Sequence, residues 1–169
     1  MLSRAMTFLV VLWLSGCSSF GEYTVRVTSN HSVQSGSIWS QDLIVTAAHM
    51  SEPASGSLCR DTAHDVMFLT NDHPDRSPAT WRDPRPNEPI KYSGYKYNTS
   101  FQLSRRTTVE GHAQGTITVP WQTSTQEFHH GTGIVLSGMS GGTVTSRVNG
   151  DSLGIIVGQA KINGSPKYS

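Results

Sequence analysis

The chain has 169 residues, of which 36% are apolar and 15% charged, and its formal net charge at pH 7 is +1. This composition indicates one compact domain and is too apolar for a disordered chain. The small net charge gives no electrostatic footprint for nucleic acid, and no basic stripe runs along the sequence. Short runs of Val, Ile and Thr, without a long 3.6-residue apolar period, predict an all-β fold.

Residues 1–16 are predicted to be a signal peptide, because a positively charged start precedes an apolar stretch over residues 5–14 that is too short to span a bilayer. The stretch ends in Leu-Ser-Gly-Cys, which resembles the lipobox where bacterial lipoprotein precursors are cleaved before an acylated cysteine. The resemblance implies a lipid on Cys17, a tether over residues 17–22 and a bacterial envelope location. Ser18 resembles the outer-membrane pattern of Gram-negative bacteria. The alternative is an ordinary signal peptide that happens to contain a cysteine.

The chain has one further cysteine, Cys59. If Cys17 carries lipid, Cys59 has no partner within the chain, which excludes an intramolecular disulfide framework. We expect Cys59 to be a half-buried structural residue, and an intermolecular bridge stays open as an alternative.

The first half of the remaining chain, residues 23–75, contains four strand signals. Residues 23–28 alternate between apolar and polar side chains, as a half-buried strand does. Residues 36–39 and 43–46 bracket a polar turn and predict a hairpin. Residues 66–70 are continuously apolar and predict a strand that is buried on both faces.

Prolines concentrate between residues 71 and 88 and forbid regular sheet pairing there, so we expect a crossover linker over residues 76–88. A second strand-rich unit is predicted over residues 89–169. Its strand signals lie at residues 90–92, 95–97, 107–110 and 116–119, and at 143–148 and 153–157 on either side of the turn signal Asn149-Gly150.

Three motifs carry candidate chemistry, in the order His, Asp, Ser. Residues 44–49 read I-V-T-A-A-H, residues 64–69 read H-D-V-M-F-L, and residues 137–142 read S-G-M-S-G-G. Each alone has an ordinary interpretation: a buried strand before a helix, an acidic residue at a strand edge, and a flexible hairpin. Together they resemble the trypsin-like (chymotrypsin-fold) serine protease family, and G-S-I-W at residues 36–39 agrees with that resemblance.

The resemblance implies a minimal two-barrel, chymotrypsin-like all-β fold that lacks the family's C-terminal helix. The first barrel would span residues 23–75 and the second residues 89–169. It also implies a serine endopeptidase acting on protein or peptide substrates, tethered to a bilayer through acylated Cys17 and working as a monomer without a cofactor.

The implied catalytic triad is His49, Asp65 and Ser140. A serine hydroxyl needs a base to take its proton, and an imidazole titrates near the working pH. A carboxylate behind the imidazole fixes its tautomer. The backbone N–H groups of Gly138 and Ser140 would form the oxyanion hole. Asp61 is the rival carboxylate, and Asp65 is preferred because the apolar run follows it at once.

Ile134 stands six residues before the serine, where family members that cleave after Lys or Arg have Asp. The resemblance therefore implies a buried apolar floor in the specificity pocket and disfavours cleavage after a cation. Which side chain is preferred stays open. The further candidates for this pocket are Ile156, Val157 and Gly158.

The histidines show no H-E-x-x-H or C-x-x-C spacing, so we expect no metal site. The pair His129-His130 lies in a region that borders the specificity pocket in the family. It has either a specificity role or a place in a solvated loop, and the solvated loop is favoured.

Met139 stands immediately before the serine, where zymogens of the family have an Asp that binds a new N-terminal ammonium. A thioether cannot accept an ammonium, so we expect Met139 to pack as an apolar plug that orders the loop.

Two other functions stay open. One is a non-catalytic envelope lipoprotein, a binding or structural module on a protease-like scaffold. The other is a triad esterase, disfavoured because the alkyl-hydrolase elbow follows a different chain order.

Overall fold

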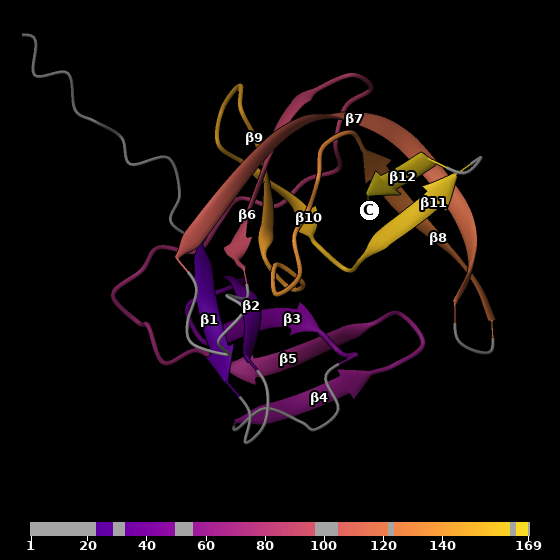
Figure 1. Ribbon diagram of the computed structural model, residues 1–169. Helices are drawn as coiled ribbons and strands as arrows, with labels where there is room; N and C mark the ends of the chain where they lie inside the picture. The colour runs from indigo at the N-terminus through magenta and orange to yellow at the C-terminus, as the bar shows by residue number, and fades with distance from the viewer. Residues whose placement is uncertain are drawn as a thin grey trace, which may run out of the picture.

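The computed structural model describes residues 23–28, 33–49, 56–96, 105–121, 124–162 and 165–168, which form twelve strands and no helix (Figure 1). The first sheet, in indigo and magenta, has the order β1-β2-β3-β5-β4. The second has the order β10-β9-β6-β7-β8-β12-β11. All pairings are antiparallel within both sheets. The strands of the first sheet are β1 (Thr24–Thr28), β2 (Val33–Ile38), β3 (Leu43–Ala47), β4 (Ser57–Asp61) and β5 (Val66–Thr70). Those of the second are β6 (Pro89–Tyr95), β7 (Arg106–Trp121), β8 (Ser124–Gly131), β9 (Thr143–Ser146), β10 (Ser152–Ile155), β11 (Gln159–Ile162) and β12 (Ser165–Tyr168).

The predicted all-β class is confirmed, and so is the hairpin that joins β2 to β3. The predicted signal peptide, the tether and Cys17 lie outside the described residues. Within the described part of the chain, no helix is long and apolar enough to cross a membrane.

Each sheet encloses a core of its own. In the first sheet, Val25 and Ile38 are among the apolar residues that pack with Met67. In the second sheet, Ile90, Tyr92 and their neighbours form a separate buried cluster. Because the two clusters are distinct, the molecule has two packed units that meet where β1 and β2 contact β6.

Two expectations about burial in the first sheet are wrong. Cys59 is exposed, not half-buried, because β4 lies at the edge of the sheet with its other face open. Strand β5 is not buried on both faces: Met67 and Leu69 are buried, whereas Val66 and Phe68 are half-buried.

The half-buried face of β5 lines a groove between the two sheets. The groove has a volume of about 560 Å³, and Ile155 of β10 forms part of its far wall. The Trp39 ring meets the Trp81 ring with centroids 4.6 Å apart, and it contacts Phe68 edge to face at 5.8 Å. Trp81 belongs to the proline-rich connection, so the connection packs across this groove.

The connection is fixed to the second sheet by an ion-pair network around the buried carboxylate of Glu88. Arg82 binds Glu88 at 2.5 Å and Asp151 at 2.7 Å, and Ser146 Oγ donates to Glu88 at 2.6 Å. Hydrogen bonds from Arg82 lower the pKa of Glu88 from 4.5 to about 2. The Glu88 carboxylate is buried, so the bonds from these partners are needed to offset the free-energy cost of removing its charge from water.

We expect the Glu88 network to make folding stability depend on pH. The folded-state pKa lies below the unfolded value, so the stabilisation is complete above pH 4.5 and is lost as the pH falls towards 2. Glu88→Gln should lower the free energy of unfolding at pH 7 by about 3 kcal/mol and flatten this dependence, as measured by urea unfolding. Glu110→Gln breaks an exposed pair with Arg147 and should cost less than about 1 kcal/mol. Equal losses in the two variants would contradict the prediction.

Candidate active site

His49 and Asp65 come together at one end of the first sheet. The antiparallel pairing of β3 with β5 ends at Ala47 and Val66. Ala48, which follows β3, therefore lies opposite Asp65, which precedes β5. The Ala48 N–H donates to the Asp65 carbonyl at 3.0 Å. His49 Nδ1 lies 2.7 Å from Asp65 Oδ2. The Asp65 side chain is fully buried, whereas 40% of the His49 side chain is exposed.

Asp61, the rival carboxylate, binds a different histidine. Its Oδ2 lies 2.6 Å from His64 Nδ1, and its Oδ1 accepts the N–H groups of Ala63 and His64. The hydrogen bond from His64 lowers the pKa of Asp61. Asp61 therefore caps the turn that leads into Asp65, which has a left-handed φ of 55°.

A further residue, not anticipated from the sequence, braces the backbone before His49. Arg60 of β4 donates to the Ala48 carbonyl from Nε at 3.0 Å and from Nη2 at 2.6 Å. Both ends of the Ala48 residue are then fixed, because its N–H is bound to Asp65. This arrangement holds the position from which the His49 side chain leaves the backbone.

Asp65 has one carboxylate oxygen without a partner. Its Oδ1 is buried and makes no hydrogen bond, so among the described residues His49 is the side-chain partner of this carboxylate. The His49 ring is therefore held from behind by one oxygen of a buried carboxylate.

The segment from Ser137 to Gly142 forms a tight loop. The Met139 N–H donates to the Leu136 carbonyl at 3.0 Å, and the Gly142 N–H donates to the Met139 carbonyl at 2.8 Å. Gly138 has a φ of 93°, a conformation that favours glycine. Within the described residues, the N–H groups of Gly138 and Ser140 have no acceptor. Two free donors therefore flank Met139.

The loop packs directly against the first sheet. The Ser35 N–H of β2 donates to the Ser140 carbonyl at 3.0 Å. A side chain on Gly141 would overlap the Ser35 carbonyl oxygen and the Thr46 hydroxyl. Thr46 belongs to the same strand end that His49 follows, so the structure brings the Ser140 loop to the end of the sheet where His49 and Asp65 lie.

Met139 is fully buried in the core of the second sheet, as the sequence predicted. Its sulfur lies 3.3 Å from the Leu136 nitrogen. Gly94 leaves room for it, since a Cβ on Gly94 would come within 2.9 Å of Met139. The loop is therefore held by apolar packing at this position.

The residues expected in a specificity pocket do not share one surface. Ile134 is 62% exposed, so it does not form the buried floor that the sequence predicted. Ile156 is 1% exposed and belongs to the core of the second sheet. Val157 is buried, and Gly158 is half-buried near Trp121. The prediction for Ile134 rested only on its position six residues before Ser140. In the structure its side chain is open to solvent and does not form the floor of a pocket.

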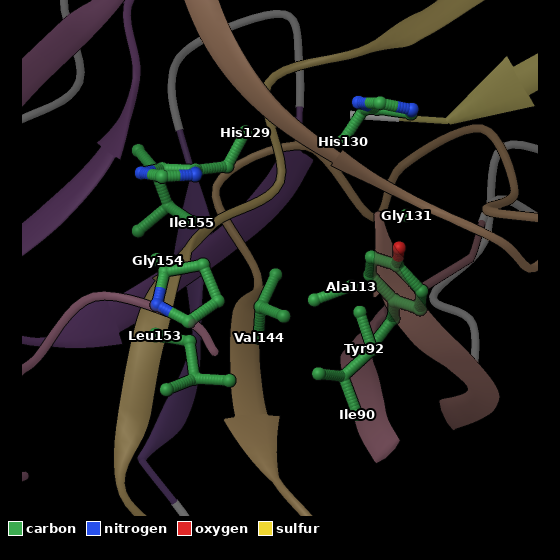
Figure 2. A pocket seen from close by; sticks show the side chains of 11 residues that line it. Ile90, Tyr92, Ala113, His129, His130, Gly131, Val144, Leu153, Gly154 and Ile155 are labelled. Carbon is green, nitrogen blue, oxygen red and sulfur yellow. The ribbon is translucent and has the colours of Figure 1, made fainter. Parts of the chain in front are cut away.

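His129 and His130 lie on β8, not in a solvated loop, and both line a cavity in the second sheet (Figure 2). The cavity has a volume of about 60 Å³ and is walled by apolar residues such as Val144 and Leu153. Burial raises the pKa of Tyr92, which also lines it, to about 12. His130 Nδ1 is buried and has no hydrogen-bond partner. Among the described residues, no group of three His, Cys, Asp or Glu side chains could hold a metal ion.

The structure is similar to solved structures that are named as proteases. The chain is similar to the Rv3671c protease from M. tuberculosis in its active form, with a TM-score of 0.67 and 18% identity, covering 86% of this chain and 73% of that chain. The MamO protease domain from Magnetospirillum magneticum, in its apo form, has a TM-score of 0.66 and 13% identity, covering 86% and 88%. For a serine endoprotease from Yersinia pestis the TM-score is 0.64 and the identity 18%, covering 86% and 56%. No family model and no curated protein matches the sequence. The chain has a chymotrypsin-like fold.

We expect the contact between the Ser140 loop and the first sheet to be intolerant of added volume. Gly141→Ala should lower the free energy of unfolding by about 2–3 kcal/mol, because the new methyl group overlaps backbone and the φ of 80° is unfavourable for alanine. Gly154→Ala is the matched control, since no atom lies within 4 Å of its Cβ position. Urea unfolding of both variants tests this, and a stable Gly141→Ala protein would show that the loop does not pack as described.

Proposed function

We propose that the chain is a serine endopeptidase with a His49–Asp65–Ser140 triad. The observation that carries the proposal is the 2.7 Å hydrogen bond between His49 and buried Asp65, at the sheet end against which the Ser140 loop is packed. The similarity of the fold to serine proteases supports the same reaction class. The substrate class is a protein or peptide.

The hydrogen bond determines which nitrogen of His49 can act as a base. A carboxylate only accepts hydrogen bonds, so Nδ1 carries the proton and Nε2 keeps its lone pair. The His49 side chain is 40% exposed, and in this proposal Nε2 is the atom that takes the proton of the Ser140 hydroxyl. Asp65 then stabilises the imidazolium that forms when Nε2 takes a proton.

In the proposed reaction, Ser140 Oγ attacks the scissile carbonyl carbon while its proton passes to His49 Nε2. The carbonyl electron pair moves onto oxygen, and the free N–H groups of Gly138 and Ser140 bind the resulting oxyanion. When the tetrahedral intermediate collapses, the carbon–nitrogen bond breaks and the amine takes the proton from His49. Water then attacks the acyl-enzyme by the same route and releases the acid and Ser140.

The packing of Met139 supports activity without a new N-terminus. Zymogen activation needs a carboxylate that binds an ammonium, whereas here the corresponding side chain is a buried thioether in the second core. Burying a lone charge there would cost several kcal/mol. The loop is ordered by apolar packing and by hydrogen bonds to the first sheet, so no cleavage beyond signal removal is required.

The proposed triad predicts that substitution of Asp65 lowers kcat much more than substitution of Asp61. Wild-type protein should hydrolyse a peptide library and be labelled at Ser140 by a fluorophosphonate, and Ser140→Ala should abolish both. Asp65→Asn should lower kcat by about 10⁴, because the amide favours the wrong imidazole tautomer. Asp61→Asn should change kcat by less than about tenfold, since Asp61 binds His64.

Two results of this experiment would count against the proposal. Absence of both hydrolysis and labelling in folded wild-type protein would favour the non-catalytic lipoprotein. A larger loss in Asp61→Asn than in Asp65→Asn would contradict the assignment of the carboxylate.

We also propose that the enzyme is held at the bacterial cell envelope by a lipid on Cys17, with the outer membrane favoured in a Gram-negative host. The support is the Leu-Ser-Gly-Cys motif at the end of the apolar stretch. Each buried CH₂ of an acyl chain contributes about 0.8 kcal/mol, so two or three chains give stable anchoring.

We expect the wild-type protein to partition into detergent and to begin at an acylated Cys17. Cys17→Ala should remove the lipid and leave the precursor unprocessed or the protein in the aqueous phase, whereas Cys59→Ala should change neither. Phase partitioning and intact-mass spectrometry make the measurement. An unmodified N-terminus downstream of Cys17 would refute the anchor.

A further inference from the structure

Ser35 of β2 lies between the two halves of the proposed active site. It belongs to the first sheet and is fully buried, and its carbonyl accepts the Thr46 hydroxyl of that sheet at 2.6 Å. Its N–H and its hydroxyl, in contrast, bond to the second half of the chain. Its N–H donates to the Ser140 carbonyl at 3.0 Å, and its Oγ donates to the Gly138 carbonyl at 2.9 Å. Its Oγ also accepts the Tyr95 N–H at 2.7 Å.

The Tyr95 contact directs the single proton of the Ser35 hydroxyl. A backbone N–H can only donate, so the Ser35 oxygen is the acceptor in that bond. The hydroxyl proton is then available to the Gly138 carbonyl. Tyr95 ends β6 in the second sheet, so the direction of this proton is set by the strand beside the loop.

The Ser35 bond fixes one end of the peptide unit that links Gly138 to Met139. The other end is fixed as well, because the Met139 N–H donates to the Leu136 carbonyl at 3.0 Å. This peptide unit lies between the two free N–H groups of Gly138 and Ser140. With both its ends bound, it cannot rotate without breaking a buried hydrogen bond.

We propose that Ser35 is a positioning residue for the oxyanion hole, which holds the two donors in one orientation through the Gly138 carbonyl and the Ser140 carbonyl. The inference rests on the proposed function and deepens it by assigning a role to a residue of the first sheet. Donors that are fixed before reaction need no reorganisation in the transition state, so the effect belongs to kcat and not to substrate binding.

Ser37 provides a matched control on the same strand. It is also fully buried, and its hydroxyl also makes two hydrogen bonds across the sheets, to the Gly141 carbonyl at 3.0 Å and to the Thr143 hydroxyl at 2.7 Å. Neither partner lies in the peptide unit between the two free donors. Ser37→Ala therefore removes a similar buried contact without releasing that unit.

The experiment compares Ser35→Ala, Ser35→Cys and Ser37→Ala for peptide hydrolysis, for thermal unfolding and for hydrogen exchange of the Met139 amide. Ser35→Ala should lower kcat by about tenfold or more with KM unchanged, while loss of a whole donor costs about 10²–10³. It should also speed exchange at Met139. Ser35→Cys keeps the site filled with a weak donor and should lie between wild type and Ser35→Ala. Ser37→Ala should lose similar thermal stability and keep kcat within about twofold.

Each outcome bears on the inference. Equal losses of kcat in Ser35→Ala and Ser37→Ala, or unchanged kcat in Ser35→Ala, would overturn the positioning role while leaving the proposed function intact. If Ser35→Ala does not fold, Ser35→Cys decides, and wild-type kcat in that variant would overturn the role. A folded wild-type protein without turnover or labelling would overturn the proposed function and the inference with it.

Discussion

The structure depends on a seam of buried hydroxyl groups where the two sheets meet. The hydroxyl groups of Thr24, Ser35 and Ser37 in the first sheet form hydrogen bonds to the second half of the chain, and two of these bonds involve Thr143. Apolar contacts alone would leave the relative position of two packed sheets loosely specified, whereas hydrogen bonds require defined distances and directions. The seam therefore fixes how the two sheets pack against each other.

The proposed active site is assembled across that seam. The first sheet contributes His49 and Asp65 through the paired ends of β3 and β5, and the second half of the chain contributes the Ser140 loop. Gly141 has no side chain, so the loop backbone can touch the first sheet directly. Apolar packing of Met139 holds the same loop from the other side. Neither half contains the complete arrangement.

Local sequence patterns predicted the all-β class and the β2–β3 hairpin, because alternation and turn residues act over a few positions. They missed β4, whose residues at 58–61 are exposed and carry no alternating apolar face. The role proposed for Ser35 could not be predicted from the sequence either. Its partner Gly138 lies 103 positions away, and a serine in a strand has no distinctive local signal. The exposure of Ile134 likewise depends on its surroundings and not on its place in a motif.

The presence of two separate cores affects the order in which the protein loses activity and structure on heating. Each core is a potential cooperative unit, and the contact between such units resembles a transient interface more than a domain interior. Hydroxyl bonds in that contact contribute about 1 kcal/mol each, and separation of the sheets would break them while leaving both apolar cores packed. Inactivation would then precede the loss of secondary structure, and the stability of the contact between the two sheets would determine the temperature of inactivation.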